Sequence, residues 1–246
     1  MNGMDPKQRS VAQEFDTYKT SYRDAVNASL GFSGLDVDFF TRVKADYLRD
    51  LLAAAFGDVA GLDVIDIGCG VGNYHKLLQP KVGTLTGVDV AAECVEQARI
   101  ENPGVRYESY DGTRLPYPDA SFDAAFTICV MHHVPPAAWA NFTREALRVL
   151  RPGGLFAVFE HNPLNPLTMR VVNRCPFDKD AVLLRKGEVV GLLDKAGFEE
   201  VTPRFILSIP AANAPLRAVD RLFSRLPFGA QYYVTGKRPG GGQPTR

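Results

Sequence analysis

The sequence predicts an α/β fold in which a doubly wound sheet carries helices on both faces. The first observation is V-I-D-I-G-C-G-V-G-N at residues 64–73, where a β-branched apolar run breaks into three glycines, as at the end of a buried strand. The second is the apolar run at 85–90, which contains an acid near its end, Asp89. The third is the alternation of apolar strands with helical patterns along most of the chain, which favours a parallel sheet.

Two helices are predicted before the first strand. Residues 9–29 have helical character, with a mainly aromatic stripe at spacings of three and four: Phe15, Tyr18, Tyr22 and Val26. The stripe either packs against the core or closes as a lid over a bound ligand, since an aromatic face attracts a cation. After a turn at 32–34, a second amphipathic helix is predicted to begin at a capping Asp36 or Asp38 and to end at Phe56.

The remaining elements alternate from Asp63 onward. Strands are predicted from apolar runs at residues 63–67, 85–90, 104–109, 122–130, 155–160, 199–208 and 231–237. Helices are predicted at residues 73–78, 91–100, 136–150, 186–196 and 216–226. Pro136 is tolerated in a first helical turn and Gly197 suits a helix end. The R-P-G-G sequence at 151–154 is predicted to turn the chain into the fifth strand.

The composition is that of an ordinary globular protein. Of 246 residues, 46% are hydrophobic, and 28 Lys plus Arg balance 28 Asp plus Glu, so no overall basic field exists to attract nucleic acid. No run approaches the ~18 apolar residues of a membrane span, and the first ten residues lack a signal-peptide core. We therefore expect a cytoplasmic protein without a membrane span or a nucleic-acid partner, and a disordered tail at 238–246.

The glycine loop has two competing interpretations. A dinucleotide-binding fingerprint needs glycines at the first, third and sixth positions of the loop. Counting from Gly68, the last glycine is Gly72, one residue early, and the sixth position is Asn73. An NAD oxidoreductase is therefore a poor match. D-x-G-x-G-x-G resembles instead the first motif of the class I S-adenosylmethionine (SAM) methyltransferases, whose loop accommodates the amino-acid end of SAM.

Asp89 is the predicted ribose ligand. It lies 21 residues after Gly68 (89 − 68 = 21), where a doubly wound fold places the carboxylate that accepts both ribose hydroxyls. A carboxylate suits a vicinal diol because it offers two acceptor oxygens. The alternative role for Asp89 is the N-cap of the helix that follows.

Two further stretches are similar to the same family: P-Y-P-D-A-S-F-D at 116–123 and L-R-P-G-G-L-F-A-V-F at 150–159. The resemblance implies the strand order 3-2-1-4-5-7-6 with an antiparallel last strand. It implies SAM as cofactor, S-adenosylhomocysteine (SAH) as product, and these cofactor contacts: Asp66, Gly68, Gly70, Gly72, Asp89, Asp111, Gly112 and Ile128. Asp111 would bond the adenine amino group, although an Asx turn uses the same Asp-Gly dipeptide.

Three histidines follow predicted strand ends, where the ligand crevice of this architecture lies. His161, then His133, then His132 are the candidate general bases, because imidazole titrates near neutrality. A hydrogen-bonded structural role is the alternative for each. His132 and His133 should diverge on an extended segment, no third ligand is apparent, and the four cysteines are scattered, so no metal is expected.

The predicted domain organisation is a helical cap at 1–45, a SAM-binding domain at 46–237 with insertions at 162–184 and 209–229, and the tail. We expect the cap and the first insertion to roof the pocket and contact the acceptor through Tyr18, Tyr22, Asn162 and Arg170. The alternative for these segments is a homodimer contact.

The expected reaction is methyl transfer from SAM to the oxygen or nitrogen of a small molecule. The N-terminal helices and the 162–184 segment look like those of bacterial enzymes of polysaccharide or secondary-metabolite pathways. The competing function is a non-catalytic protein with the SAM fold that binds a partner through its insertions.

Overall fold

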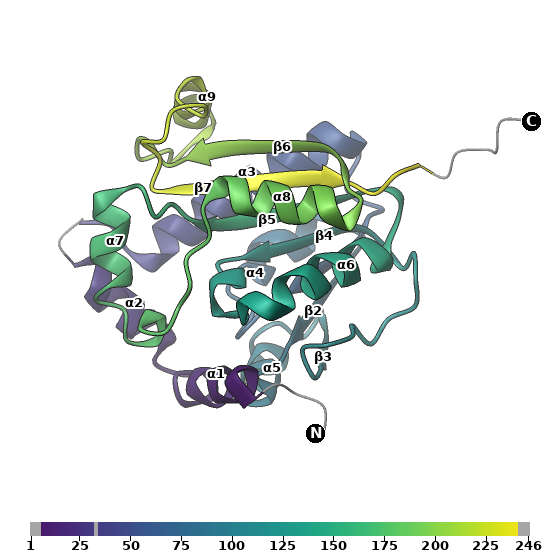
Figure 1. Ribbon diagram of the computed structural model, residues 1–246, viewed down its shortest axis with the longest axis horizontal. Helices are drawn as coiled ribbons and strands as arrows, with labels where there is room; N and C mark the ends of the chain where they lie inside the picture. The colour runs from purple at the N-terminus through teal and green to yellow at the C-terminus, as the bar shows by residue number, and fades with distance from the viewer. Residues whose placement is uncertain (1–5, 32–33, 241–246) are drawn as a thin grey trace, which may run out of the picture.

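A single sheet organises the molecule (Figure 1). The structure, a computed structural model, describes residues 6–31 and 34–240, except for the side chain of Tyr22. Its strands are β1 (Asp63–Ile67), β2 (Thr84–Asp89), β3 (Arg106–Ser109), β4 (Phe122–Ile128), β5 (Leu150–His161), β6 (Glu199–Ile206) and β7 (Gln231–Lys237). Within the described residues they form a seven-stranded sheet in the order β3-β2-β1-β4-β5-β7-β6. β7 runs antiparallel to both its neighbours, so the predicted topology is confirmed.

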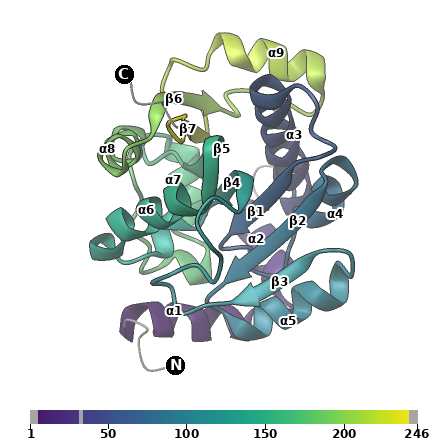
Figure 2. The same ribbon diagram turned by 90° about the vertical axis from the view of Figure 1, so that its right-hand side faces the viewer.

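Helices cover both faces of the sheet (Figure 2). The α-helices are α1 (Pro6–Thr17), α2 (Tyr22–Leu30), α3 (Val37–Phe56), α4 (His75–Leu78), α5 (Ala92–Glu101), α6 (Trp139–Val149), α7 (Pro166–Val172), α8 (Lys186–Ala196) and α9 (Ala214–Leu222). Short 3-10 turns are η1 (Gln79–Lys81), η2 (Met131–His133), η3 (Pro136–Ala138) and η4 (Pro176–Asp178). No helix of the described part is both long and apolar enough to cross a bilayer.

The core is split in two by the sheet. Val64 and Phe126 pack on the side of α3, α4 and α5, whereas Ile65 packs on the side of α6 and α8. Strands buried on both faces are apolar at nearly every position, which is why the runs at 63–67 and 122–128 lack a polar alternation. Each fully buried Val, Ile or Phe contributes about 1.5–3 kcal/mol.

Several helix ends follow from their capping residues, as predicted. The Asp36 carboxylate accepts from the Phe39 backbone N–H at 2.7 Å, so Asp36, not Asp38, is the N-cap of α3. Gly197 follows α8 with φ +98°, the left-handed conformation that glycine adopts without strain.

The predicted helix at 9–29 is wrong as one continuous element, because the chain turns between α1 and α2. The Thr17 hydroxyl donates to the Glu14 carbonyl oxygen at 2.6 Å, and the backbone N–H of Tyr18 donates to Phe15. Thr and Ser compete with helical backbone bonds in this way. The sequence at 17–21 contains three of them. The predicted turn at Phe32-Ser33-Gly34 falls partly outside the described residues, as does most of the tail at 238–246.

The predicted turn at 151–154 is instead part of the long strand β5. The Gly153 N–H donates to the Arg238 carbonyl, and the Arg238 N–H donates to the Gly154 carbonyl, so the residue after β7 extends the pairing. The register between β4 and β5 shifts between Phe122 and Ala124. Gly153 has φ +79°, so glycine at this irregularity removes backbone strain.

The segment 162–184 is more ordered than a loop. It contains α7 and η4. Asn165 starts α7 by accepting from the N–H groups of Leu167 and Thr168, and Asn165 also donates to the Phe228 carbonyl at 2.8 Å. The two insertions, at 162–184 and 209–229, therefore lie against each other.

Candidate cofactor and acceptor site

The three glycines of the loop after β1 have different roles, although all have positive φ. A Cβ on Gly68 would lie 2.5 Å from the Val130 side chain, and one on Gly72 would lie 2.6 Å from the Tyr107 hydroxyl. These two glycines are required by packing against protein. A Cβ on Gly70 meets no described atom within 4 Å, so Gly70 borders open space.

Asp89, at the end of β2, reaches across to that loop. Its carboxylate accepts from the Gly70 N–H at 2.7 Å and from the Ala91 N–H at 2.9 Å. Burial raises the pKa of Asp89 to about 6, against the lowering effect of these hydrogen bonds. A carboxylate has about four acceptor positions, so two remain for a ligand.

Asp89 is not the N-cap of α5, which was the alternative role. Ala91 occupies the N-cap position and makes no side-chain cap bond. The Asp16 carboxylate of α1 instead accepts from the N–H groups of Glu93 and Cys94, at 3.0 and 3.2 Å. The first helix of the chain thus caps the helix that follows the acid (Figure 1).

Asp66 is not among the described residues that line the cavity. Its carboxylate accepts from His75 Nε2 at 3.0 Å, and His75 Nδ1 lies 2.5 Å from the Tyr107 hydroxyl oxygen. All three side chains are buried. Burial raises the pKa of Asp66, although the His75 bond opposes this. Asp66 therefore supports the glycine loop from beneath.

The predicted adenine acid, Asp111, makes the Asx turn that was its alternative. Its Oδ1 accepts from the Thr113 N–H at 2.8 Å and from the Thr113 hydroxyl at 2.6 Å, and these bonds hold its pKa below the usual value. Asp111 and Gly112 lie outside the described wall of the cavity, whereas Ile128 lines it. At Gly112, a Cβ would collide with the Gln8 amide.

The glycine loop, Asp89 and the ends of β4 and β5 open into one cavity of about 370 Å³, within the usual size of a small-molecule site. Its wall also includes residues of α1, α2, α3, α7 and η4 and of the 207–210 segment. Both expected roof segments therefore line the cavity in this structure.

The roof is held together by aromatic contacts. Phe177 of η4 packs against Tyr18 and Phe15, with ring centroids 5.3 and 5.6 Å apart, and Phe15 meets His133 edge-on at 4.9 Å. Tyr18 lines the cavity. The side chain of Tyr22 lies outside the described part of the structure.

Asn162 and Arg170 are not brought to the cavity wall described here. The Asn162 amide is buried and donates to the carbonyl oxygens of Pro227 and Gly229, so it joins the two insertions. Arg170 is exposed on the far side of α7 from the cavity-lining Thr168 and Val171. The prediction chose long or polar side chains of the 162–184 segment, whereas α7 presents Leu167, Thr168 and Val171 to the cavity.

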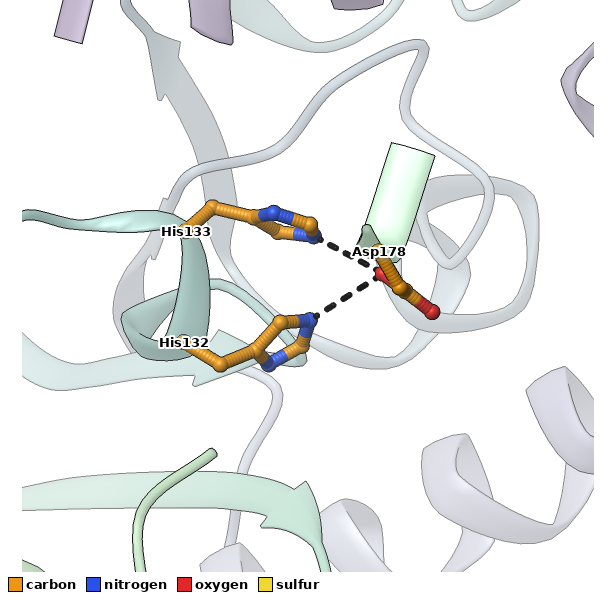
Figure 3. Close-up of side chains that lie close together, drawn as sticks. All are labelled: His132, His133 and Asp178. Atoms are coloured by element: carbon orange, nitrogen blue, oxygen red, sulfur yellow. Dashed lines mark ion pairs between the residues drawn. The ribbon is translucent and has the colours of Figure 1, made fainter. Parts of the chain in front are cut away.

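The expectation that His132 and His133 diverge is wrong, because η2 is a tight turn and not an extended segment. The two ring centroids lie 4.1 Å apart. His132 Nε2 and His133 Nε2 both point at Asp178 Oδ1, at 3.6 and 3.3 Å (Figure 3). The missing third group thus comes from η4, 45 residues further along the chain (178 − 133 = 45).

Glu160 completes this cluster. Its Oε2 lies 2.5 Å from His132 Nδ1, and its Oε1 accepts from the N–H groups of Val130 and Met131. Burial opposes a charge on His132, but Glu160 and Asp178 raise its pKa well above the ordinary value. Burial lowers the pKa of His133 to about 4.

His161 lies beside a second group that the sequence analysis missed. Gln231 Nε2 is 3.3 Å from His161 Nδ1 and 3.8 Å from Cys129 Sγ, and Lys44 Nζ is 3.6 Å from the same sulfur. Burial would raise the pKa of Cys129, but the charge of Lys44 lowers it to about 7. These residues line the cavity.

Lys44 and Cys129 carry weak signals in the sequence. Lys44 lies within an amphipathic helix, where a lysine usually faces solvent, yet it is 6% exposed. Cys129 follows β4 with φ +58°, a conformation that is uncommon for residues other than glycine. The positive φ bends the chain from β4 into η2.

Comparison with known proteins agrees with this geometry. A family model described as "Methyltransferase domain" matches residues 65–158. Methyltransferase GfsG of Streptomyces halstedii is 33% identical over 180 residues, which are 68% of this chain and 64% of that protein. A Synechocystis protein named "Uncharacterized methyltransferase sll0829" is 30% identical over 57% of this chain and 68% of its own length.

The 27-O-demethylrifamycin SV methyltransferase of Amycolatopsis mediterranei is 36% identical over 45% of this chain and 43% of its own length. The chain spans about half the length of the first curated relatives it matches. Among solved structures, a SAM-dependent methyltransferase of Thermotoga maritima superposes with a TM-score of 0.64 at 20% identity, over 93% of this chain and 99% of that one.

Proposed function

The chain belongs to the class I SAM-dependent methyltransferases, and from that premise we propose that it transfers the methyl group of SAM to a small-molecule acceptor and releases SAH. The observation that carries the proposal is the meeting of Gly70 and Asp89 in one cavity. A glycine beside open space, bonded through its N–H to a half-buried carboxylate, is a cradle that a side chain would fill.

In this proposal the amino-acid end of SAM lies along the loop that contains Gly68, Gly70 and Gly72. Asp89 accepts both ribose hydroxyls with its remaining acceptor positions. Ile128 contributes apolar contact from the end of β4. Asp111 can bond the adenine amino group only if its Asx turn opens, or if Oδ2, which the turn does not use, accepts that hydrogen bond. Asp66 acts indirectly, by holding His75 and the loop.

The acceptor would bind on the other side of the cavity, under the cap and the 162–184 segment. Tyr18, Phe15 and Phe177 offer aromatic surface there, and Thr168 and Val171 replace the predicted Asn162 and Arg170 as contacts from the first insertion. A largely apolar roof would limit water at the reaction centre and align the nucleophile with the sulfonium methyl, and alignment can supply about 7–11 kcal/mol.

We favour an oxygen acceptor. Methyl transfer to a hydroxyl oxygen breaks the S–CH3 bond of SAM, forms an O–CH3 bond and releases the hydroxyl proton, which a base must accept. Histidines border the cavity. His161 remains the proposed base: both ring nitrogens of His132 face carboxylates, and His133 Nε2 faces Asp178. The buried Gln231 Oε1 has no partner among the described residues. A half-turn of the Gln231 amide would place its Oε1 against His161 Nδ1. The imidazole proton would then lie on His161 Nδ1, and His161 Nε2 would keep a lone pair to act as the base.

One relative supports an oxygen acceptor, since it is named a 27-O-demethylrifamycin SV methyltransferase. This assignment is part of the proposal for the present chain. The non-catalytic alternative predicts SAM binding without SAH production.

Calorimetry with SAM, SAH and NAD, followed by an SAH-release assay over a panel of hydroxylated small molecules, tests the proposal. We expect SAM and SAH to bind and NAD not to bind, and SAH to accumulate with at least one acceptor. Binding of NAD in place of SAM would refute the cofactor assignment. SAM binding with no turnover by any acceptor class would favour the non-catalytic alternative.

A further inference from the structure

We propose that His132, His133 and Asp178 form a binding site for a divalent transition-metal ion in the wall of the cavity (Figure 3). The site goes beyond the proposed function, because binding of the ion requires neither SAM nor an acceptor. It also replaces the expectation of no metal, whose premise was the lack of a third ligand.

The donor atoms have the separation that such an ion requires. His132 Nε2 and His133 Nε2 lie 3.6 and 3.3 Å from Asp178 Oδ1, and the three donors lie within 4.8 Å of one another. Ligands that surround a tetrahedral ion at ~2.0–2.1 Å are roughly 3.3–3.4 Å apart. The two His–Asp178 pairs are already close to this separation, and the two histidine Nε2 atoms lie within 4.8 Å of each other. Two imidazoles and a carboxylate suit Zn²⁺ and its first-row neighbours.

Glu160 provides the outer support that metal-binding histidines usually have. Its Oε2 lies 2.5 Å from His132 Nδ1, on the side of the ring opposite Asp178. This bond favours the tautomer with hydrogen on Nδ1 and a lone pair on Nε2. Backbone N–H groups of Val130 and Met131 fix Glu160 in turn, so the His132 ring is oriented in advance.

Charge also favours a dication. The Glu160 side chain is 1% exposed and that of Asp178 is 8% exposed. Two negative charges therefore converge on the buried His132 and on His133, whose side chain is 11% exposed. A proton held by His132 offsets one of these charges. A divalent ion bound by two neutral imidazoles offsets both, and buried charges are stabilised only when they are paired in this way.

The backbone holds the two halves of the site together. The Val182 N–H donates to the His132 carbonyl at 2.9 Å, and the Ala181 N–H donates to the Asp178 carbonyl at 3.1 Å. Phe15 covers the edge of His133. The carboxylate is thus carried by a segment that is fastened to the histidine turn, and three protein ligands leave a coordination position to be filled from the cavity.

The test uses the full chain, stripped with a chelator, dialysed and titrated with ZnCl₂ in a calorimeter, with CoCl₂ in parallel as a spectroscopic probe. We expect one ion per chain and visible Co²⁺ absorption typical of four or five ligands. Glu160→Gln keeps the ligands and should weaken Zn²⁺ binding about 10- to 100-fold. Asp178→Asn removes a ligand oxygen's charge and should weaken binding at least as much.

His161→Gln is the matched control, because it removes a neighbouring cavity histidine that is not a proposed ligand, and its Zn²⁺ affinity should equal that of the wild type. Thermal unfolding of each variant without metal verifies that it folds. The proposal is overturned if the wild type binds no ion, a result that needs no variant. It is overturned equally if Asp178→Asn and Glu160→Gln bind Zn²⁺ as tightly as the wild type.

Discussion

At the scale of residues, Asp89 connects the glycine loop to the second strand. Each carboxylate oxygen accepts one backbone N–H, from Gly70 or from Ala91, so the side chain cannot rotate without losing a bond. A ligand that donates two hydroxyl hydrogens would meet a carboxylate already fixed in place. Such preorganisation reduces the entropy lost on binding.

Asp89→Ala should weaken SAM binding by about 1.5–3 kcal/mol, because it removes charge-assisted bonds to two ribose hydroxyls. Calorimetry would record this as a rise in Kd of roughly one to two orders of magnitude. Asp89→Asn retains one acceptor oxygen and should lose less. Equal affinities for wild type and Asp89→Ala would remove Asp89 from the ribose site.

SAM affinity should also fall as the pH drops below about 6, the pKa of Asp89, because the protonated acid accepts fewer hydrogen bonds. The limiting loss is about tenfold per pH unit. The stability of the ligand-free fold depends on pH in the opposite direction. The folded protein holds a proton that the unfolded chain has lost between pH 4 and 6, so Asp89 makes the fold less stable as the pH rises through that window. Calorimetry from pH 5 to 8 checks the prediction, and Asp89→Asn should give a nearly flat profile there.

Single residues were the hardest to predict from sequence. Asp89 could be selected as the candidate ribose acid because its spacing from the glycines is a local property of the sequence. Asp178 and Lys44 could not be selected in this way, because each reaches the cavity through tertiary packing of a distant segment. The strand-end position of Asn162 predicts proximity to the crevice, but it does not predict that the amide turns to the carbonyl oxygens of Pro227 and Gly229.

At the scale of elements, the loop between β1 and α4 divides its glycines between packing and ligand space. Gly70→Val should abolish measurable SAM binding, because the side chain would occupy the open space and also strain a residue at φ +50°. Gly57→Val is the control, since Gly57 has φ +74°, also meets no described atom within 4 Å, and lies at the end of α3. It should lower the unfolding temperature and leave the SAM Kd unchanged.

The roof elements make a separate prediction. Tyr18→Ala should raise the KM for the acceptor severalfold, with a smaller effect on SAM, because it removes the ring that packs on Phe177 over the cavity. Arg170→Ala, which changes an exposed residue of the same roof, should leave both constants near wild type. Steady-state SAH release with the identified acceptor measures both. A Tyr18→Ala enzyme with unchanged KM would show that the cap does not contact the acceptor.

Strands and most long helices followed from the sequence because their signals are local: buried runs, an N-cap at Asp36 and a glycine at 197. The division of the 9–29 segment into α1 and α2 could not be predicted from the sequence, because the helical spacing of aromatic residues continues through the turn at 17–21. The inclusion of 151–154 in β5 depends on pairing with residue 238, a contact that no local pattern contains.

At the scale of the whole molecule, the cavity joins the sheet to segments from both ends of the chain, so a bound ligand should stabilise the entire fold. SAH at 100 times its Kd should add about 2.7 kcal/mol. For a domain of this size, that is a rise in unfolding temperature of roughly 5–10 °C. Differential scanning fluorimetry measures it. Asp89→Ala at the same SAH concentration is the control and should show a clearly smaller rise.

The strand order was predictable only through family resemblance, since apolar alternation indicates a parallel sheet without giving its order. The cavity wall was less predictable still. Its roof is assembled from α1, α2, α7 and η4, and packing among these elements depends on side chains such as Phe15 and Phe177 that look like ordinary core residues in the sequence.

The Asp16 cap ties α1, which lines the cavity, to the start of α5. If α1 moved away from α5, the first N–H groups of α5 would lose this acceptor. The loss would cost about 1 kcal/mol, which makes such an open state roughly fivefold less populated. Because α5 begins shortly after Asp89, the proposed ribose acid, release of a ligand past α1 would require breaking these cap bonds. Asp16→Ala should therefore shorten the residence time of SAH in stopped-flow displacement, while an exit on another side would leave it unchanged.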